Sequence, residues 1–172
     1  HPLHPQEHDL DPEPLFVAVL LKSIQLSLQE VLQGRELTLI LDDSLDRLPL
    51  VEADINGARK VFYHLMVNAV KYTPDGGEIR VWGRALPDTS TPFHRPGIEV
   101  VVSDTGIGVD PSVQDLIFAK FYQTGRVSSH SSSLSEFKGG GPGLGLAIAR
   151  GIVEAHEGQI WVESPGYDEI NC

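Results

Sequence analysis

A glycine-rich turn placed directly before a helix constrains this chain more than any other feature. In "GGGPGLGLAIARGIVEAHEGQIWVES", residues 139–164, five of the first seven residues are glycine. Ordered glycine costs roughly 0.5–1 kcal/mol relative to alanine, so bare backbone must be needed there. Gly141, Gly143 and Gly145 would let the backbone N–H groups at the start of a helix over 146–156 approach phosphate oxygens closely. Taken alone, a flexible hinge before a helix explains the pattern equally well.

The charge balance limits the partners of the chain. Its 172 residues include 24 acidic and 13 basic ones, giving a formal net charge of −11. Such a surface repels nucleic acids and anionic membranes, so we expect no nucleic-acid partner and no direct membrane contact. The single cysteine, Cys172, cannot form an internal disulfide, which fits a cytoplasmic location. A membrane anchor elsewhere in a larger parent protein stays open.

Hydrophobic periodicity predicts the helices. Apolar residues spaced by three and four predict one helix over 17–31, with Gly34 as its stop, and a second over 55–72. Asp54 is a suitable N-cap for the second helix, and Pro74 follows its end. Residues 1–14 are expected to be a flexible N-terminal segment and residues 15–172 a single domain.

Alternating apolar residues and turn signals predict the other elements. Strands are expected at 36–41, 77–84, 97–104 and 159–164, and a short helical or turn segment at 111–123. The serine-rich stretch 128–135 cannot bury much apolar surface and should be mobile. The order of elements predicts an α+β fold, a two-layer sandwich with helices on one face of a mixed sheet.

A carboxylate near the end of one predicted strand is the second notable feature. In "SDTGIG", Asp104 shares a strand face with Ile98, Val100 and Val102. A carboxylate on a core-facing side is costly unless it accepts hydrogen bonds, and the amino group of adenine is a suitable donor. Gly106 and Gly108 would let a planar base lie close to the backbone. A turn that simply begins at Asp104 is the alternative.

The third feature is the polar face of the predicted second helix. In "HLMVNAVKYTP", His64, Asn68 and Tyr72 follow one another at intervals of four and share a face, with Lys71 adjacent. The amide oxygen of Asn68 suits Mg²⁺, and the ammonium group of Lys71 suits a phosphate. Alone, this pattern is also that of an ordinary helix with a polar face.

Together, in this order and spacing, the motifs resemble the ATP-binding catalytic domain of bacterial two-component sensor histidine kinases. "VNAVKYTPDGG" is similar to the N box of that family, "SDTGIG" to its first glycine box, "IFAKFYQ" to its F box, and "GPGLGLAIARGIVEAHEGQIWVES" to its second glycine box. The similarity covers residues 12–164. It implies a Bergerat-type sandwich, in which three helices back a mixed sheet and a mobile lid covers ATP.

The resemblance also implies roles for individual residues. Asn68 would hold Mg²⁺ and Lys71 would contact phosphate, the two being the catalytic residues, while Asp104 would read adenine. The other residues expected at the nucleotide are Tyr72, Gly106, Gly108, Phe121, Tyr122, Gly141, Gly143, Leu144, Gly145 and Leu146. The lid would lie at 122–138, where Arg126 and Lys138 either reach phosphate or stay solvated loop charges.

Three features depart from the family pattern. His64 stands where histidine kinases usually carry asparagine and related ATPases a catalytic glutamate. Pro142 replaces the usual threonine or serine and removes one possible contact to phosphate. After "PGYDEINC" the family normally adds a strand, so either the sequence is a fragment cut short or that strand is absent, and a sheet edge would then be unpaired.

The activity implied by the resemblance is transfer of the γ-phosphoryl group of Mg-ATP to a histidine on a separate dimerisation domain. A response regulator would receive the phosphoryl group indirectly, and ADP would remain. None of the seven histidines fits the acceptor pattern, His8 coming nearest. Two alternatives stay open. One is a non-catalytic nucleotide-binding regulatory module of the same fold, which the intact Asn68, Asp104 and three glycines count against but which Pro142 and His64 keep open. The other is a self-contained clamp-type ATPase, which the long second glycine box disfavours.

Overall fold

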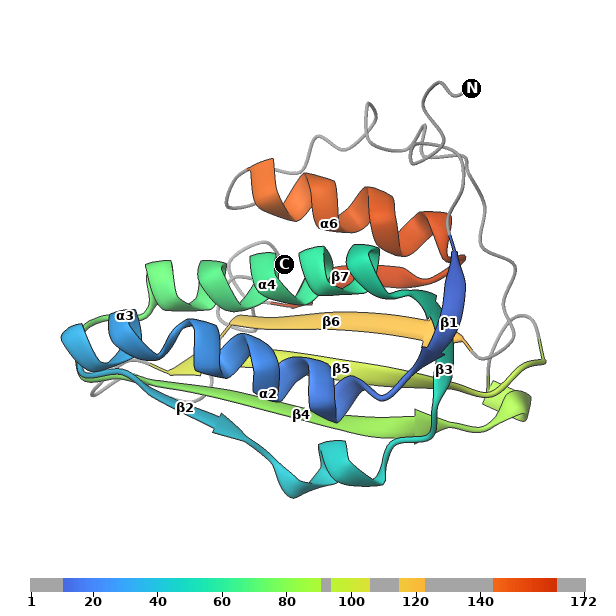
Figure 1. Ribbon diagram of the computed structural model, residues 1–172, viewed down its shortest axis with the longest axis horizontal. Coiled ribbons are helices and arrows are strands. Elements are labelled where there is room, and N and C mark those ends of the chain that lie inside the picture. Colours follow the sequence, from blue (N-terminus) through green and yellow to red (C-terminus); the bar gives the residue numbers. More distant parts are fainter. Residues whose placement is uncertain (1–10, 91–93, 106–114, 123–143, 164–172) are drawn as a thin grey trace, which may run out of the picture.

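The computed structural model describes residues 11–90, 94–105, 115–122 and 144–163. In chain order its elements are β1 (Pro12–Leu15), α2 (Val17–Ser27), α3 (Gln29–Gly34), β2 (Thr38–Leu41), the 3₁₀ helix η1 (Asp43–Arg47), β3 (Val51–Asp54), α4 (Ile55–Tyr72), β4 (Glu78–Leu86), the 3₁₀ helix η2 (Asp88–Ser90), β5 (Gly97–Thr105), β6 (Asp115–Tyr122), α6 (Leu144–Ala155) and β7 (Gln159–Glu163). The helices α2, α4 and α6 lie over one face of a large sheet (Figure 1).

The large sheet is mixed. Its strand order is β2-β4-β5-β6-β7, in which β2 and β4 run parallel and every other neighbouring pair runs antiparallel. A second, two-stranded sheet pairs β1 with β3 and closes one end of the sandwich (Figure 1). The predicted α+β architecture, with helices on one face of a mixed sheet, is therefore confirmed.

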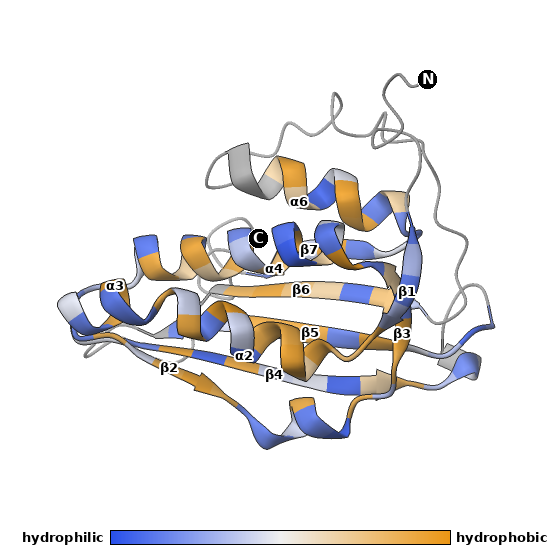
Figure 2. Ribbon diagram, in the orientation of Figure 1, coloured by the Kyte–Doolittle hydropathy of each residue, from blue (hydrophilic) through white to orange (hydrophobic). Residues whose placement is uncertain are grey.

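The core lies between the sheet and the helices. Val81, Val100 and Ala119 come from three adjacent strands and are fully buried, as are Phe62 and Leu65 of α4. Figure 2 shows apolar residues along the central strands and along the helices that cover them. Burying such side chains contributes about 1.5–3 kcal/mol each, so this layer is the main source of stability.

The segment at 111–123 differs from the prediction. Residues 115–122 form the strand β6 between β5 and β7, not a helix or turn. Ile117, Ala119 and Phe121 are buried toward the helices, whereas Phe118 and Lys120 between them are only half-buried on the other face. Burial alternates along this segment with the period of two that is typical of a strand. Pairing with β5 on one side and β7 on the other satisfies backbone groups that a turn would leave to solvent.

The second predicted helix has the bounds that the sequence indicates. Asp54 caps α4: its carboxylate accepts a hydrogen bond from the backbone N–H of Gly57 at 2.8 Å. The helix ends at Tyr72, two residues before Pro74. The first predicted helix runs to Gly34 as expected but is broken at Leu28 into α2 and α3.

The helix after the glycine-rich turn begins at Leu144, two residues before the predicted start, and ends at Ala155. Its exit to β7 is tight. Glu157 has a positive φ of 62°, and the N–H of Gly158 donates to the carbonyl of Val153 at 2.8 Å. A Cβ atom on Gly158 would lie 2.1 Å from the backbone oxygen of Lys120, so β6 and the end of α6 can approach only at a glycine.

Candidate nucleotide-binding site

Asn68 lies on the half-buried polar face of α4, together with His64. The Nδ2 atom of Asn68 is buried and has no hydrogen-bond partner among the described residues. A buried polar atom left without a partner costs about 1–3 kcal/mol, and a ligand that bonds to this side chain would remove that cost. Rotation of the amide by a half turn presents the oxygen instead of the nitrogen to such a ligand.

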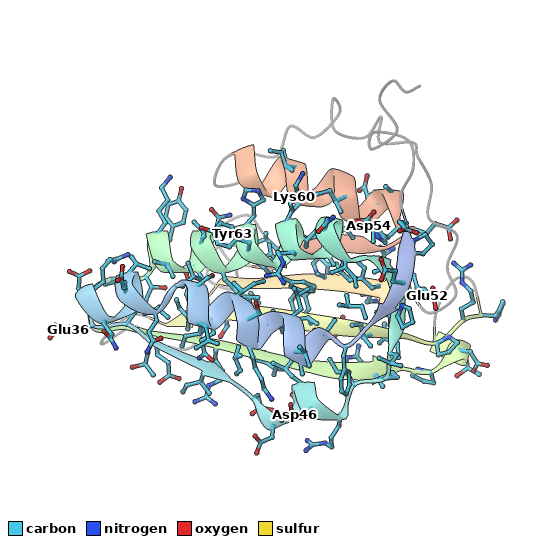
Figure 3. The ribbon with its side chains drawn as sticks, viewed as in Figure 1. Glu36, Asp46, Glu52, Asp54, Lys60 and Tyr63 are labelled. Carbon is cyan, nitrogen blue, oxygen red and sulfur yellow. The ribbon has the colours of Figure 1, made fainter. Side chains whose placement is uncertain are left out.

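His64 sits one turn before Asn68 on the same face. Its ring contacts that of the neighbouring Tyr63 edge-on, with the centroids 6.3 Å apart. Figure 3 shows that Lys60, one turn before His64, projects from α4 on the side where α6 lies. The predicted polar face of α4 is therefore present, and it borders the helix that follows the glycine-rich turn.

Lys71 and Tyr72 occupy the last turn of α4. Both side chains are exposed, Tyr72 by 51% of its surface, and the Nζ atom of Lys71 lies 5.5 Å from the centre of the Tyr72 ring. Within the described residues, Lys71 has no carboxylate partner, so its charge is available to a ligand. A cation at the C-terminal end of a helix is also favoured by the helix dipole.

Asp104 lies near the end of β5, in register with Ile79 of β4 and Asp115 of β6. It shares the helix-facing side of the sheet with Ile98, Val100 and Val102, as predicted, and it is half-buried where those three are buried. A carboxylate thus stands at the edge of the apolar layer, on the same side of the sheet as α4. Its proposed glycine neighbours, Gly106 and Gly108, lie outside the described residues.

The phosphate-side loop is described only in part. Leu144, Gly145 and Leu146 form the first turn of α6, so the expected helix start is present. Gly141, Pro142 and Gly143 lie outside the described residues. The same holds for most of the expected lid, residues 123–138, with Arg126 and Lys138. Their predicted contacts stay predictions.

Phe121 and Tyr122 lie on opposite faces of the sheet. Phe121 points toward the helices, with its ring centre 5.7 Å from that of Phe62 and 5.6 Å from that of His156. Tyr122 is equally buried on the other face, where burial raises the pKa of its hydroxyl. The structure therefore brings Phe121, and not Tyr122, to the side that carries Asn68 and Asp104.

A match to a family model covers most of the described fold. Residues 53–169 match the family of histidine kinase-, DNA gyrase B- and HSP90-like ATPases. The chain belongs to this family. The match begins at β3 and includes α4, β5 and α6, the elements that carry the candidate site.

Curated relatives place the domain among the kinases of this family. The domain is 39% identical over 135 residues to the adaptive-response sensory kinase SasA of Synechococcus sp. (strain JA-2-3B'a(2-13)), an alignment that covers 77% of this chain and 31% of SasA. It is 38% identical over 159 residues to the phosphate regulon sensor protein PhoR of Pseudomonas aeruginosa, covering 91% of this chain and 32% of PhoR. The domain thus spans about a third of the length of these relatives.

Solved structures agree on the fold. The catalytic domain of histidine kinase ThkA in a nucleotide-free form superposes with a TM-score of 0.56 at 18% identity, covering 88% of this chain and 93% of that one. Full-length ShkA in complex with AMPPNP also gives 0.56, at 19% identity, covering 91% of this chain and 31% of ShkA. The predicted Bergerat-type α+β sandwich is therefore confirmed. No helix in the described part of the domain is long and apolar enough to cross a membrane.

The residues present fit a magnesium ion that a nucleotide helps to hold. The described ranges contain no group of three or more His, Cys, Asp or Glu side chains that could form a metal site. Mg²⁺ commonly takes one or two protein oxygens and completes its shell with water and substrate phosphates. The partly buried amide of Asn68, whose nitrogen has no partner in the part of the chain that the structure describes, is suited to be such a single protein ligand.

Sequence reasoning missed the contact by which His156 fixes α6 against α4, at the end of α6 away from the glycine-rich turn. Its Nε2 atom accepts a hydrogen bond from the backbone N–H of Asp54 at 2.9 Å, and its Nδ1 atom lies 2.8 Å from the carbonyl oxygen of Ile152. Only the neutral ring with its proton on Nδ1 satisfies both contacts. The ring is buried, and this burial lowers its pKa. His156 thereby joins the end of α6 to the capping residue of α4 (Asp54 in Figure 3).

Proposed function

We propose that this domain is the catalytic, ATP-binding module of a sensor histidine kinase. It binds Mg-ATP and donates the γ-phosphoryl group to a histidine on a separate dimerisation domain. The observation that carries the proposal is the buried Nδ2 atom of Asn68 on α4, which has no hydrogen-bond partner among the described residues. Asp104, on the same side of the sheet, gives that site a second polar contact for a nucleotide.

Each side chain has a role that follows from its chemistry. The carboxylate of Asp104 accepts a hydrogen bond from the amino group of adenine, with Gly106 and Gly108 beside the base. Tyr72 and Phe121 contribute to the walls of the site, and Lys71 places a positive charge at the phosphates. Gly141, Gly143 and the first turn of α6 offer N–H groups to phosphate oxygens.

Phosphoryl transfer of this kind depends mainly on positioning and on charge neutralisation. Magnesium, when bound, supplies part of that neutralisation. Asn68 would hold that metal, and Lys71 together with the helix amides would balance the remaining charge of the phosphates. The attacking imidazole comes from outside this chain, since no histidine here stands in the acceptor pattern.

The names of the relatives support the wider setting. SasA is named a sensory kinase and PhoR a sensor protein, and a structure of histidine kinase ThkA contains the response regulator TrrA. We infer that the parent protein works in the cytoplasm in two-component signalling, with a response regulator accepting the phosphoryl group after the histidine.

Calorimetry tests the nucleotide part of the proposal. Because Asp104 accepts from an amino group, ADP should bind and GDP, whose carbonyl would face the carboxylate, should not. Asp104→Asn should weaken ADP binding by roughly 1.5–3 kcal/mol, the usual contribution of a hydrogen bond to a charged group. Equal affinities of the wild-type domain for ADP and GDP would refute the assignment.

A further inference from the structure

The C-terminal end of α4 has backbone carbonyl groups that the helix itself cannot provide with N–H partners. In a continuing helix the carbonyl of Val70 would accept from the N–H of residue 74, but that residue is Pro74, which has no N–H. The last carbonyls of the helix therefore need partners from elsewhere. The hydroxyl of Thr73 donates to the carbonyl of Ala69 at 2.6 Å, but that oxygen already accepts from the N–H of Thr73 at 3.0 Å, so the carbonyl of Val70 is not helped.

Arg35, which lies 35 residues before Val70 in the chain, supplies the missing donors. Its Nη1 donates to the carbonyl of Val70, and its Nη2 donates to the carbonyl of Thr73 at 2.5 Å. Its Nε pairs with the carboxylate of Asp75 at 2.7 Å. The carbonyl of Arg35 also accepts from the N–H of Gly76 at 3.0 Å. One residue thus holds the segment 70–76 at four points.

The two carbonyls bound by the guanidinium group lie directly before and after the pair Lys71 and Tyr72. Both of these side chains are exposed, so packing does not fix their directions. The positions of these two side chains therefore depend on the backbone of the last helical turn. Arg35 binds that backbone before and after them. The rigid guanidinium plane can reach two carbonyls and a carboxylate at once, whereas a lysine ammonium group is a single point charge.

We propose that Arg35 is a positioning residue for the phosphate end of the nucleotide site. It acts through Lys71 and Tyr72 and does not itself touch the nucleotide. This inference rests on the proposed ATP binding. It predicts that loss of Arg35 weakens the binding of ligands that carry phosphates, while ligands that carry only the base and ribose are held by Asp104 as before.

The test is calorimetric titration of the domain with Mg-ADP and with adenosine. We expect Arg35→Ala to weaken Mg-ADP about tenfold, the usual effect of losing a charged hydrogen-bonding group, and to change adenosine affinity less than about twofold. Arg35→Lys should recover part of the loss, because it keeps the charge but not the two-carbonyl contact. Asp75→Asn keeps both carbonyl contacts and should stay within about twofold of wild type.

Arg80→Ala is the matched control. Arg80 is a half-exposed arginine in a surface pair with Glu78 at 3.0 Å, and its loss should leave both affinities unchanged. A double-mutant cycle then separates positioning from general damage: in a Lys71→Ala background, Arg35→Ala should cost little further Mg-ADP affinity. Arg35→Lys serves the same comparison if Arg35→Ala does not fold.

The outcomes are distinct. Unchanged Mg-ADP affinity in Arg35→Ala, an equal loss for Mg-ADP and adenosine, or full additivity with Lys71→Ala would each overturn the positioning role and leave the proposed function standing. A wild-type domain that binds neither ligand would overturn both.

Discussion

Acidification should weaken this domain through one buried ring, that of His156. In the folded state the neutral imidazole accepts from the N–H of Asp54 and donates to the carbonyl of Ile152. A proton on Nε2 would remove the acceptor and place a charge in a buried site. The carboxylate of Asp54 opposes this in part, but desolvation is the larger effect, and the pKa of His156 in the folded domain is lowered.

The sign of the pH dependence follows from that direction. The folded-state pKa lies below the ordinary histidine value of about 6.5, so between the two values the unfolded chain binds one proton more than the folded one. The contribution of His156 to the free energy of unfolding is therefore complete above about pH 6.5. It is lost on acidification by up to about 1.4 kcal/mol per pH unit until the folded-state pKa is reached.

The size of the contribution can be worked from the contacts. His156→Phe keeps a ring of similar volume but leaves the N–H of Asp54 without a partner, at a cost of about 1–3 kcal/mol. The carbonyl of Ile152 retains the backbone N–H of residue 156, at 3.2 Å, so the second lost bond adds only about 0.5–1.5 kcal/mol. We expect a total loss of about 1.5–4.5 kcal/mol at pH 8.

Urea unfolding of the wild type and of His156→Phe between pH 5 and pH 8 measures this directly. Subtracting the two curves removes the titration of the other six histidines, because both proteins share them. The difference should be largest at pH 7–8 and should shrink below pH 6.5. A difference that stays constant to pH 5, or that grows as pH falls, would show that His156 is not held neutral by its contacts.

Two further predictions concern the helix α4. Asn68→Ala should remove the Mg²⁺ dependence of ATP affinity and leave adenosine binding nearly intact. Titration with ATP in the presence and absence of Mg²⁺ measures this dependence. If the dependence survives in Asn68→Ala, the metal site lies elsewhere. The rate of ATP hydrolysis in His64→Asn, measured against wild type, shows whether the imidazole only packs against the helix or also positions a water molecule. We expect the slow hydrolysis of ATP to be unchanged, and a clear drop in its rate would assign His64 a catalytic part.

Local signals in the sequence were sufficient for some elements. The bounds of α4 follow from a capping aspartate, a regular apolar spacing and a proline after the end, all of which act within a few residues. The shared faces of Asn68 with His64 and of Asp104 with Val102 follow from helical and strand periodicity alone. These are the parts of the candidate site that the sequence could predict.

Contacts between distant segments could not be predicted. "LIFAKF" is too short for its period to separate a helix from a strand, and only the neighbours β5 and β7 decide the matter. The bond from Asp54 to His156 spans 102 residues, and that from Arg35 to Thr73 spans 38. No local pattern announces such bonds, although a histidine closing an apolar helix just before Gly158 was a hint that its ring is buried.

Phosphoryl transfer in trans distinguishes a kinase module from a module that only binds the nucleotide. The isolated domain is incubated with γ-labelled ATP and Mg²⁺, with and without a histidine-bearing dimerisation domain from a sensor kinase. We expect acid-labile, base-stable label on the added domain only, and none on this chain by itself. Stoichiometric label on the isolated chain, with His8 the first residue to examine, would contradict the assignment of an external acceptor. ATP binding without label on either protein would contradict the catalytic role and favour a nucleotide-binding regulatory module.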